Sequence, residues 1–197
     1  INAVYKMAKV IEAIRTLEPT HHPVLGDGIL ELTDIKSAPY PGASVVPEYC
    51  RATYDRRLLV GETKESVLAP IQELLDKLMA EDPQLKAKVS YAVGKEQCYT
   101  GNEITGERFF PGWLYDEKDE FVQDVKKELE GMGYTPEITQ YNFCTNGSHY
   151  AGEAGIKTFG LGPSKENLAH TVNEYIEIDQ LTKVTDCYYG VMKALLK

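Results

Sequence analysis

Apolar and polar residues follow each other along the first hundred positions in patterns that predict two helices and a strand pair between them. Apolar residues three or four positions apart line one face of a first helix over residues 1–17. Segments 28–37 and 43–59 are strand-like, and the Pro- and Gly-rich break between them predicts a hairpin. Thr63 is the expected N-cap of a second helix. The apolar stripe of that helix consists of Val67, Ile71, Leu74, Leu75 and Leu78.

A further strand is predicted over residues 87–93, where apolar and polar positions alternate. The order of elements up to residue 100 is therefore helix, strand, strand, helix, strand. One more strand ahead of Ile1 would complete the β-α-β-β-α-β unit of ferredoxin-like domains. We therefore expect residues 1–105 to form a ferredoxin-like domain that lacks its first strand.

The rest of the chain, residues 106–197, predicts part of a parallel α/β layer, in which ligands bind at loops beyond the strand ends. Segment 100–113 is rich in glycine and aromatic residues and has neither a helical nor an alternating period, so we expect a loop at the domain boundary. The expected elements after it are a helix over 116–132, strands over 137–143 and 155–162, and a final helix marked by apolar residues from Leu181 to Leu195.

Composition describes a folded chain whose partner is a small molecule or a protein. Of its 197 residues, 43 % are hydrophobic and 26 % are charged, which is typical of globular proteins. The net charge of −9 argues against nucleic acid and anionic membranes as partners, because these attract clustered Lys and Arg. The sequence has no apolar run of membrane-spanning length and no signal-peptide pattern, so we expect a cytoplasmic location. Four widely spaced cysteines without a C-x-x-C pair are typical of reduced thiols.

The segment GPSKENLAHTVNE, residues 162–174, places His170 in a loop between a predicted strand and a predicted helix. Such loops often present functional side chains on a rigid scaffold. A lone loop histidine is more often a solvated or hydrogen-bonded imidazole, so position alone leaves both interpretations open. The overlapping GLGPSK resembles a phosphate-binding loop but lacks the closing Gly-Lys-Ser/Thr, which argues against nucleotide binding there.

Four motifs of the chain occur in the order of one known enzyme family. INAVYKM is similar to the first helix of its lid domain, VVPEYCRATYDRRLLVGET to its lid strand, CTNGSHYAG to its Gly-rich substrate loop, and GPSKENLAHTVNE to its last metal-binding motif. Together they resemble the zinc-dependent aminoacylase, carboxypeptidase and deacetylase family (peptidase family M-twenty). Within the family, the sequence is most similar to acetylornithine deacetylase-like members, in the branch of selenium-metabolism hydrolases.

This resemblance implies roles for particular residues. His170 corresponds to a metal ligand, and Arg57 to an arginine that binds a substrate carboxylate through its planar, permanently charged guanidinium. Asn146, Gly147 and Ser148 match a loop whose backbone N–H groups and hydroxyl bind an anionic group. A surface arginine and a plain Asn-Gly turn are the alternatives for these positions.

Two further residues have less direct counterparts. Ser44 stands where many members have an asparagine that helps to polarise the scissile carbonyl across the dimer, and a serine hydroxyl has less reach for such an oxyanion contact. Glu174 is either an orienting partner of His170 or a solvated surface residue.

The sequence therefore predicts an α+β fragment of a metal-dependent amidohydrolase, with a ferredoxin-like lid or dimerisation domain over 1–105 and the C-terminal portion of an α/β zinc-peptidase catalytic domain over 106–197. The complete enzyme is expected to bind two zinc ions, or manganese or cobalt, and to cleave an amide bond of an N-acyl amino acid or a dipeptide with a metal-activated water.

Most metal ligands and the general base are expected upstream of Ile1, so the chain alone should bind no metal tightly and be inactive. The lid is expected to form a homodimer. The alternative is a ferredoxin-like module that binds a small molecule or dimerises without catalysis.

Overall fold

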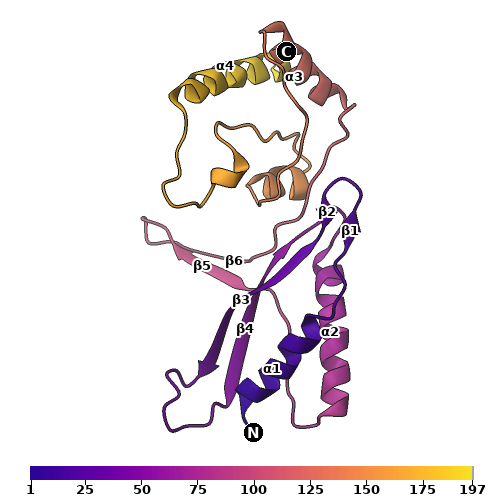
Figure 1. The fold of residues 1–197 in the computed structure, drawn as a ribbon, viewed down its shortest axis with the longest axis vertical. Coiled ribbons are helices and arrows are strands. Elements are labelled where there is room, and N and C mark those ends of the chain that lie inside the picture. The colour runs from indigo at the N-terminus through magenta and orange to yellow at the C-terminus, as the bar shows by residue number, and fades with distance from the viewer. Residues whose placement is uncertain (197) are drawn as a thin grey trace. The chain divides into compact units, whose positions relative to one another are not determined.

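The computed structural model describes residues 1–196. They form two compact units, one from Ile1 to Gly112 and one that begins at Trp113 (Figure 1). Within residues 1–196, helices and three separate two-stranded antiparallel sheets make up a mixed α/β fold. The division falls beyond residue 105 because a hairpin that includes residues 103–107 belongs to the first unit.

Capping residues set where the first two helices begin. Helix α1 spans Ala3–Ile14, and the side chain of Asn2 accepts two backbone N–H groups of its first turn. Helix α2 spans Lys64–Glu81 and is capped by Thr63, as predicted. Thr63 and Ser66 exchange side-chain-to-backbone bonds of 3.1 and 2.9 Å, which satisfy two N–H groups that no helical carbonyl reaches.

A minor strand pair lies between α1 and the main hairpin. Strands β1 (His21–His22) and β2 (Gly26–Asp27) run antiparallel, and the His21 Nδ1 lies 2.7 Å from the Asp27 Oδ1. The His22 Nδ1 accepts two backbone N–H groups within the turn. Both histidines therefore have partners within this turn.

Strands β3 (Ile29–Ala38) and β4 (Tyr49–Arg57) form the predicted antiparallel hairpin. Strand β4 begins later than expected, so the predicted strand over 43–59 is wrong for its first six positions. Residues 39–48 form the connection instead, because the three prolines among them have no N–H for a ladder. Ser44 lies in this connection with a left-handed φ of 61°.

The core of the first unit lies where α1 and α2 pack on the β3–β4 hairpin, and Figure 1 shows both helices beside it. Its buried members are Val10, Ile14, Ile71, Leu75 and Leu85. Leu30 of β3 and Tyr54 of β4 pack against them. Because burying one such aliphatic side chain contributes about 1.5–3 kcal/mol, the predicted helix stripes supply much of what holds the hairpin in place.

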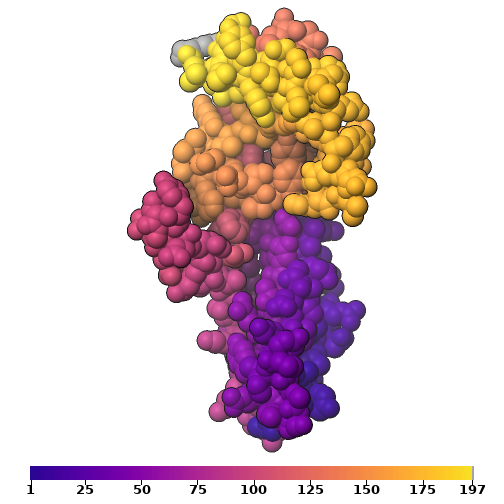
Figure 2. All heavy atoms as spheres, turned by 90° about the vertical axis from the view of Figure 1, so that its left-hand side faces the viewer, coloured from indigo at the N-terminus to yellow at the C-terminus, as the bar shows by residue number. Residues whose placement is uncertain are grey.

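Strand pairing after α2 differs from the prediction. Strand β5 (Val93–Gln97) pairs antiparallel with β6 (Glu103–Glu107), and the turn between them includes Gly101 at a φ of 88°. The expected strand over 87–93 is therefore wrong except at its last residue, and the expected loop over 100–113 contains a strand. In Figure 2 the β5–β6 hairpin (magenta) projects from the rest of the first unit.

The four-stranded sheet of a ferredoxin-like domain is not formed among residues 1–196, because β3 and β4 pair only with each other. Residues 87–92 contact the unit through side chains instead: Val89 packs on the core, and the Tyr91 hydroxyl donates to the Lys64 carbonyl at 2.9 Å. Their alternating pattern thus reflects alternating burial without ladder pairing.

Helices α3 (Glu120–Gly131) and α4 (Ile178–Leu195) pack together in the second unit. The buried centre between them consists of Val125, Leu129 and Ala194. Helix α3 ends as predicted, with Gly133 at a φ of 88° just beyond it. Among the described helices, none combines the length and the apolar character that crossing a membrane demands.

Neither predicted strand of the second unit is formed in the described part of the chain: residues 137–143 and 155–162 take part in no ladder. The two segments touch where the Tyr141 ring lies against the backbone of Gly160, since a Cβ built on Gly160 would lie 2.1 Å from the Tyr141 Cε2. A parallel strand needs a neighbouring strand for its N–H and C=O groups, and none of the described segments provides one. The expected parallel layer is therefore absent from residues 113–196.

Candidate functional site

The loop that carries His170 has a strained backbone. His170 has a φ of 60°, in the left-handed region that few non-glycine residues adopt. Its N–H donates to the Glu174 Oε2 at 3.1 Å, so Glu174 acts on the main chain of His170. The 3₁₀ turn η2 (Glu166–Leu168) precedes the loop, and the Thr171 hydroxyl donates to the Leu168 carbonyl at 2.7 Å. Residues in such sparsely populated backbone conformations cluster at active sites and ligand-binding loops, so this backbone is compatible with the role predicted for His170.

The remainder of this loop is attached to the start of α4. Ser164, with a φ of 76°, donates its N–H to the Gln180 Oε1 at 2.6 Å and its hydroxyl to the Tyr175 carbonyl at 3.2 Å. Asn173 is also left-handed, with a φ of 60°. Three left-handed residues, His170 included, therefore lie within ten positions on a loop that α4 anchors.

His170 is the one metal ligand that the resemblance implies here, and the described residues do not complete a metal centre. Across residues 1–196, no three His, Cys, Asp or Glu side chains gather as a metal site requires. A catalytic zinc takes three protein ligands. The described residues therefore do not by themselves fit a bound zinc.

The neighbouring arginines at the end of β4 have different surroundings, because successive strand residues face opposite sides. The Arg57 Nη2 contacts the Asp55 Oδ2 at 2.9 Å, and the Arg57 side chain is 42 % exposed. Arg56 is 19 % exposed and pairs with Glu62. Of the two, Arg57 presents its guanidinium to the surface of the first unit.

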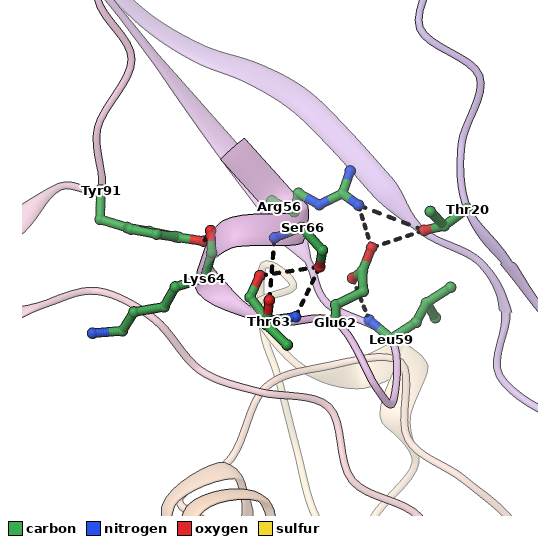
Figure 3. A network of polar contacts seen from close by, with 8 residues as sticks. All are labelled: Thr20, Arg56, Leu59, Glu62, Thr63, Lys64, Ser66 and Tyr91. Carbon is green, nitrogen blue, oxygen red and sulfur yellow. Dashed lines mark hydrogen bonds and ion pairs between the residues drawn. The ribbon is translucent and has the colours of Figure 1, made fainter. Parts of the chain in front are cut away.

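Glu62 is the centre of a polar network that sequence reasoning missed. Figure 3 shows its carboxylate accepting from the Arg56 guanidinium, from the Thr20 hydroxyl at 2.9 Å and from the Leu59 N–H at 2.7 Å. The network fixes the turn between β4 and α2, and with it the end of β4 that carries Arg57. In the sequence it shows only as a Gly-Glu pair: Leu59 and Arg56 lie three and six positions before Glu62, but Thr20 lies 42 positions away.

The loop at residues 144–148 leads into a π-helix, η1 (Ser148–Glu153). Ser148 is 4 % exposed, and its Oγ lies 3.6 Å from the Cys144 Sγ. The Gly147 N–H donates to the Thr145 Oγ1, and the Ser148 N–H to the Thr145 carbonyl, each at 3.1 Å. Asn146 is exposed. The loop thus uses two of its N–H groups and the hydroxyls of Thr145 and Ser148 internally, and it presents the Asn146 side chain outward.

The two candidates of the first unit, Ser44 and Arg57, are not brought together within it. Ser44 lies in the connection between β3 and β4, whereas Arg57 is the last residue of β4. Nine extended residues span about 30 Å. These side chains therefore belong to opposite ends of the same hairpin.

All four cysteines are free thiols. Burial raises the pKa of the Cys50 and Cys187 thiols, which disfavours the thiolate needed by a nucleophile. These two therefore act as packing residues.

Comparison with known proteins shows which family this chain resembles. Residues 10–194 match the model of peptidase family M20/M25/M40. The uncharacterized protein YgeY of Escherichia coli K12 is 32 % identical over 176 residues, which is 88 % of this chain and 42 % of YgeY. The N-formyl-4-amino-5-aminomethyl-2-methylpyrimidine deformylase of Halalkalibacterium halodurans is 28 % identical, over 93 % of this chain and 44 % of the deformylase.

Among solved structures, the aminopeptidase PepT of Bacillus cereus matches the fold of the whole chain, with a TM-score of 0.63 at 19 % identity over 46 % of PepT. The chain thus spans less than half the length of these relatives.

Proposed function

The chain belongs to peptidase family M20/M25/M40, and we propose that it is part of a metal-dependent amidohydrolase. The match over residues 10–194 is the observation that carries this proposal. It also confirms the family that the sequence motifs indicated, and it covers three of the four motifs, all except INAVYKM at residues 1–7. The relative from Halalkalibacterium halodurans is named a deformylase, which is a hydrolase.

We propose that the substrate is an N-acyl amino acid or a dipeptide. A deformylase removes an acyl group from nitrogen, which supports cleavage of an amide bond. The Arg57 guanidinium supports a substrate with a carboxylate, because its planar fork binds carboxylates through two parallel hydrogen bonds. The Asp55 carboxylate contacts the Arg57 Nη2 at 2.9 Å and holds the guanidinium in place. A guanidinium has five N–H donors in all, so this contact does not use them all.

In the second unit we assign His170 as one metal ligand and Asn146 as the outward side chain of the substrate loop. Zinc is the proposed metal, with manganese or cobalt as alternatives. His170 contributes one imidazole, and the other ligands and the general base are assigned to parts of the enzyme beyond these residues. Pairing of segments 137–143 and 155–162 with further strands of the catalytic domain is part of the same proposal.

An amide-hydrolysis assay on the intact metal-loaded protein tests this function, with a panel of N-acyl amino acids and dipeptides. We expect turnover of at least one substrate, loss on chelation and recovery on adding metal. Residues 1–197 alone should show no turnover and retain no stoichiometric zinc after dialysis. If residues 1–197 alone retain stoichiometric zinc and turn over substrate, the proposal that the other metal ligands and the general base lie beyond these residues is contradicted. If the intact protein turns over no substrate of the panel, the proposed hydrolase function is contradicted.

We also propose that the first unit acts as the lid and pairs with a second copy of itself. Within residues 1–196, β3 and β4 each have one outer edge without a strand partner, and such edges recruit other strands. Tyr5 on α1 is 73 % exposed and adds apolar surface to this unit. Since Ser44 and Arg57 lie at opposite ends of the hairpin, a site using both would take Ser44 from the second copy.

Light scattering over a concentration series tests the pairing. A stable dimer should bury more than about 1,000 Å² in total. A chain that stays monomeric at high concentration, or a dimer that pairs through residues 113–196, would contradict the assignment of the lid.

A further inference from the structure

Gly147 in the 144–148 loop lies directly against the indole ring of Trp113. A Cβ built on Gly147 would lie 2.7 Å from Cζ2 and 2.8 Å from Cε2 and Nε1 of this ring, closer than real Cβ atoms approach other heavy atoms. Gly147 has a φ of −54° and a ψ of −28°, which any residue adopts. The glycine is therefore explained by the close approach of the ring, and backbone freedom plays no part.

The Trp113 ring is in turn held by a chain of aromatic contacts that ends in the core of the second unit. Ring centroids are 5.9 Å apart for Trp113 and Tyr115, 4.8 Å for Tyr115 and Phe121, and 5.1 Å for Phe121 and Phe159. Phe159 packs on the buried centre between α3 and α4, and the Tyr115 hydroxyl donates to the Ile156 carbonyl at 2.8 Å. Edge-to-face and tilted ring pairs of this kind are favourable beyond the burial of their area. The indole therefore has a defined position relative to the α3–α4 core.

The loop that rests on the indole is braced internally, so a displacement at Gly147 is passed on to its neighbours. Thr145 accepts the N–H groups of both Gly147 and Ser148. The Asn146 carbonyl accepts the Tyr150 N–H at 3.2 Å, which ties Asn146 to the first turn of η1. Residues 145–148 are thus one braced unit seated on Trp113, with the Asn146 side chain exposed.

We propose that Trp113 is the positioning residue of this loop: its indole sets where Asn146 is presented to the substrate. The inference rests on the proposed function, in which the loop contacts an anionic part of the substrate. Trp113 acts only through the loop and touches no reacting atom. The glycine at 147 and the tryptophan at 113 are accordingly a matched pair, although 34 positions separate them.

A double-mutant cycle on KM in the intact enzyme tests the coupling. Gly147→Ala should raise KM about 10-fold or more with a smaller change in kcat, because misplacing a substrate-positioning group by 1 Å costs up to about 100-fold. Trp113→Leu removes the three ring atoms that the new methyl group would meet. In that background, Gly147→Ala should raise KM less than about 3-fold, since interacting pairs are non-additive. The control is Gly131→Ala, where a Cβ meets nothing within 4 Å, and KM should stay unchanged.

Fluorescence gives a readout that does not depend on turnover, because Trp113 is the one tryptophan of the 197 residues. In residues 1–197, Gly147→Ala should shift the Trp113 emission maximum, and Gly131→Ala should not. An unshifted maximum would overturn the close contact whether or not the enzyme is a hydrolase. A shifted maximum with unchanged KM, or an equal KM effect of Gly147→Ala in both backgrounds, would overturn the positioning role while leaving the amidohydrolase proposal intact.

Discussion

Replacement of His170 by alanine in the intact protein should strip or weaken one bound metal and lower kcat/KM by more than about 100-fold. Changes to residues that merely orient a metal ligand already cost about 10–100-fold, and loss of the ligand itself removes a bond that water replaces poorly. The bond to Glu174 uses the His170 backbone N–H, so it survives the substitution. Histidine and alanine both carry a Cβ, so the substitution does not newly introduce the steric cost of the left-handed φ of 60° at this position. Metal analysis after dialysis, together with steady-state kinetics, measures both effects.

Arg57→Ala is the matched control for this experiment, because it removes a proposed substrate contact in the other unit. It should raise KM chiefly, since a carboxylate contact is made in the ground state and the transition state alike. Metal content should stay at the level of the unsubstituted protein. Full metal content in His170→Ala would remove His170 from the ligand set, and unchanged kinetics in Arg57→Ala would make that residue an ordinary surface arginine.

Replacement of Glu62 by alanine should lower the free energy of unfolding of the first unit by about 3 kcal/mol. Removing one partner of a buried ion pair costs about 3–5 kcal/mol, because the remaining charge is left uncompensated. The lower end applies because Arg56 and Glu62 keep 19 % and 11 % of their side-chain surface exposed. The Arg56 Nε is already buried without a partner among the described residues, which adds to the cost of leaving Arg56 alone.

Urea unfolding followed by hydrogen exchange on peptides from α1 and α2 restricts this measurement to the first unit. The control is Glu12→Ala, which breaks the ion pair between Glu12 and Arg15, both 71 % exposed. Exposed pairs contribute about 0–1 kcal/mol, so the control should change stability little. Equal effects of the two substitutions would show that the Glu62 network is no stronger than a surface pair.

The elements that sequence patterns predicted well are those with local causes. The Thr63 cap is an example, because Thr63 and its partner Ser66 lie within one helical turn. The β3–β4 hairpin was also predicted, since the Pro- and Gly-rich break after β3 is a property of the local sequence, although β4 begins six positions later than predicted. The missed β5–β6 hairpin shows the opposite case: residues 103–107 carry no alternating pattern, and all five are exposed. Patterns of apolar and polar residues report burial, and burial is not what causes β5 and β6 to pair.

The candidate site divides along the same line. The order of four motifs along the chain was enough to identify the family and to single out His170, Arg57 and the 144–148 loop, because residue types at given spacings are properties of the chain itself. Glu62 pairs with Arg56 and so leaves Arg57 as the exposed arginine of β4. Thr145 binds the N–H groups of the 144–148 loop and so leaves Asn146 facing outward. The Trp113 ring is the reason that residue 147 is a glycine. The sequence by itself determined the family, the helices and the residue types of the site. Only the tertiary structure decided the partners of those residues, because hydrogen bonds, ion pairs and ring contacts join positions whose distance along the chain says nothing about their distance in space.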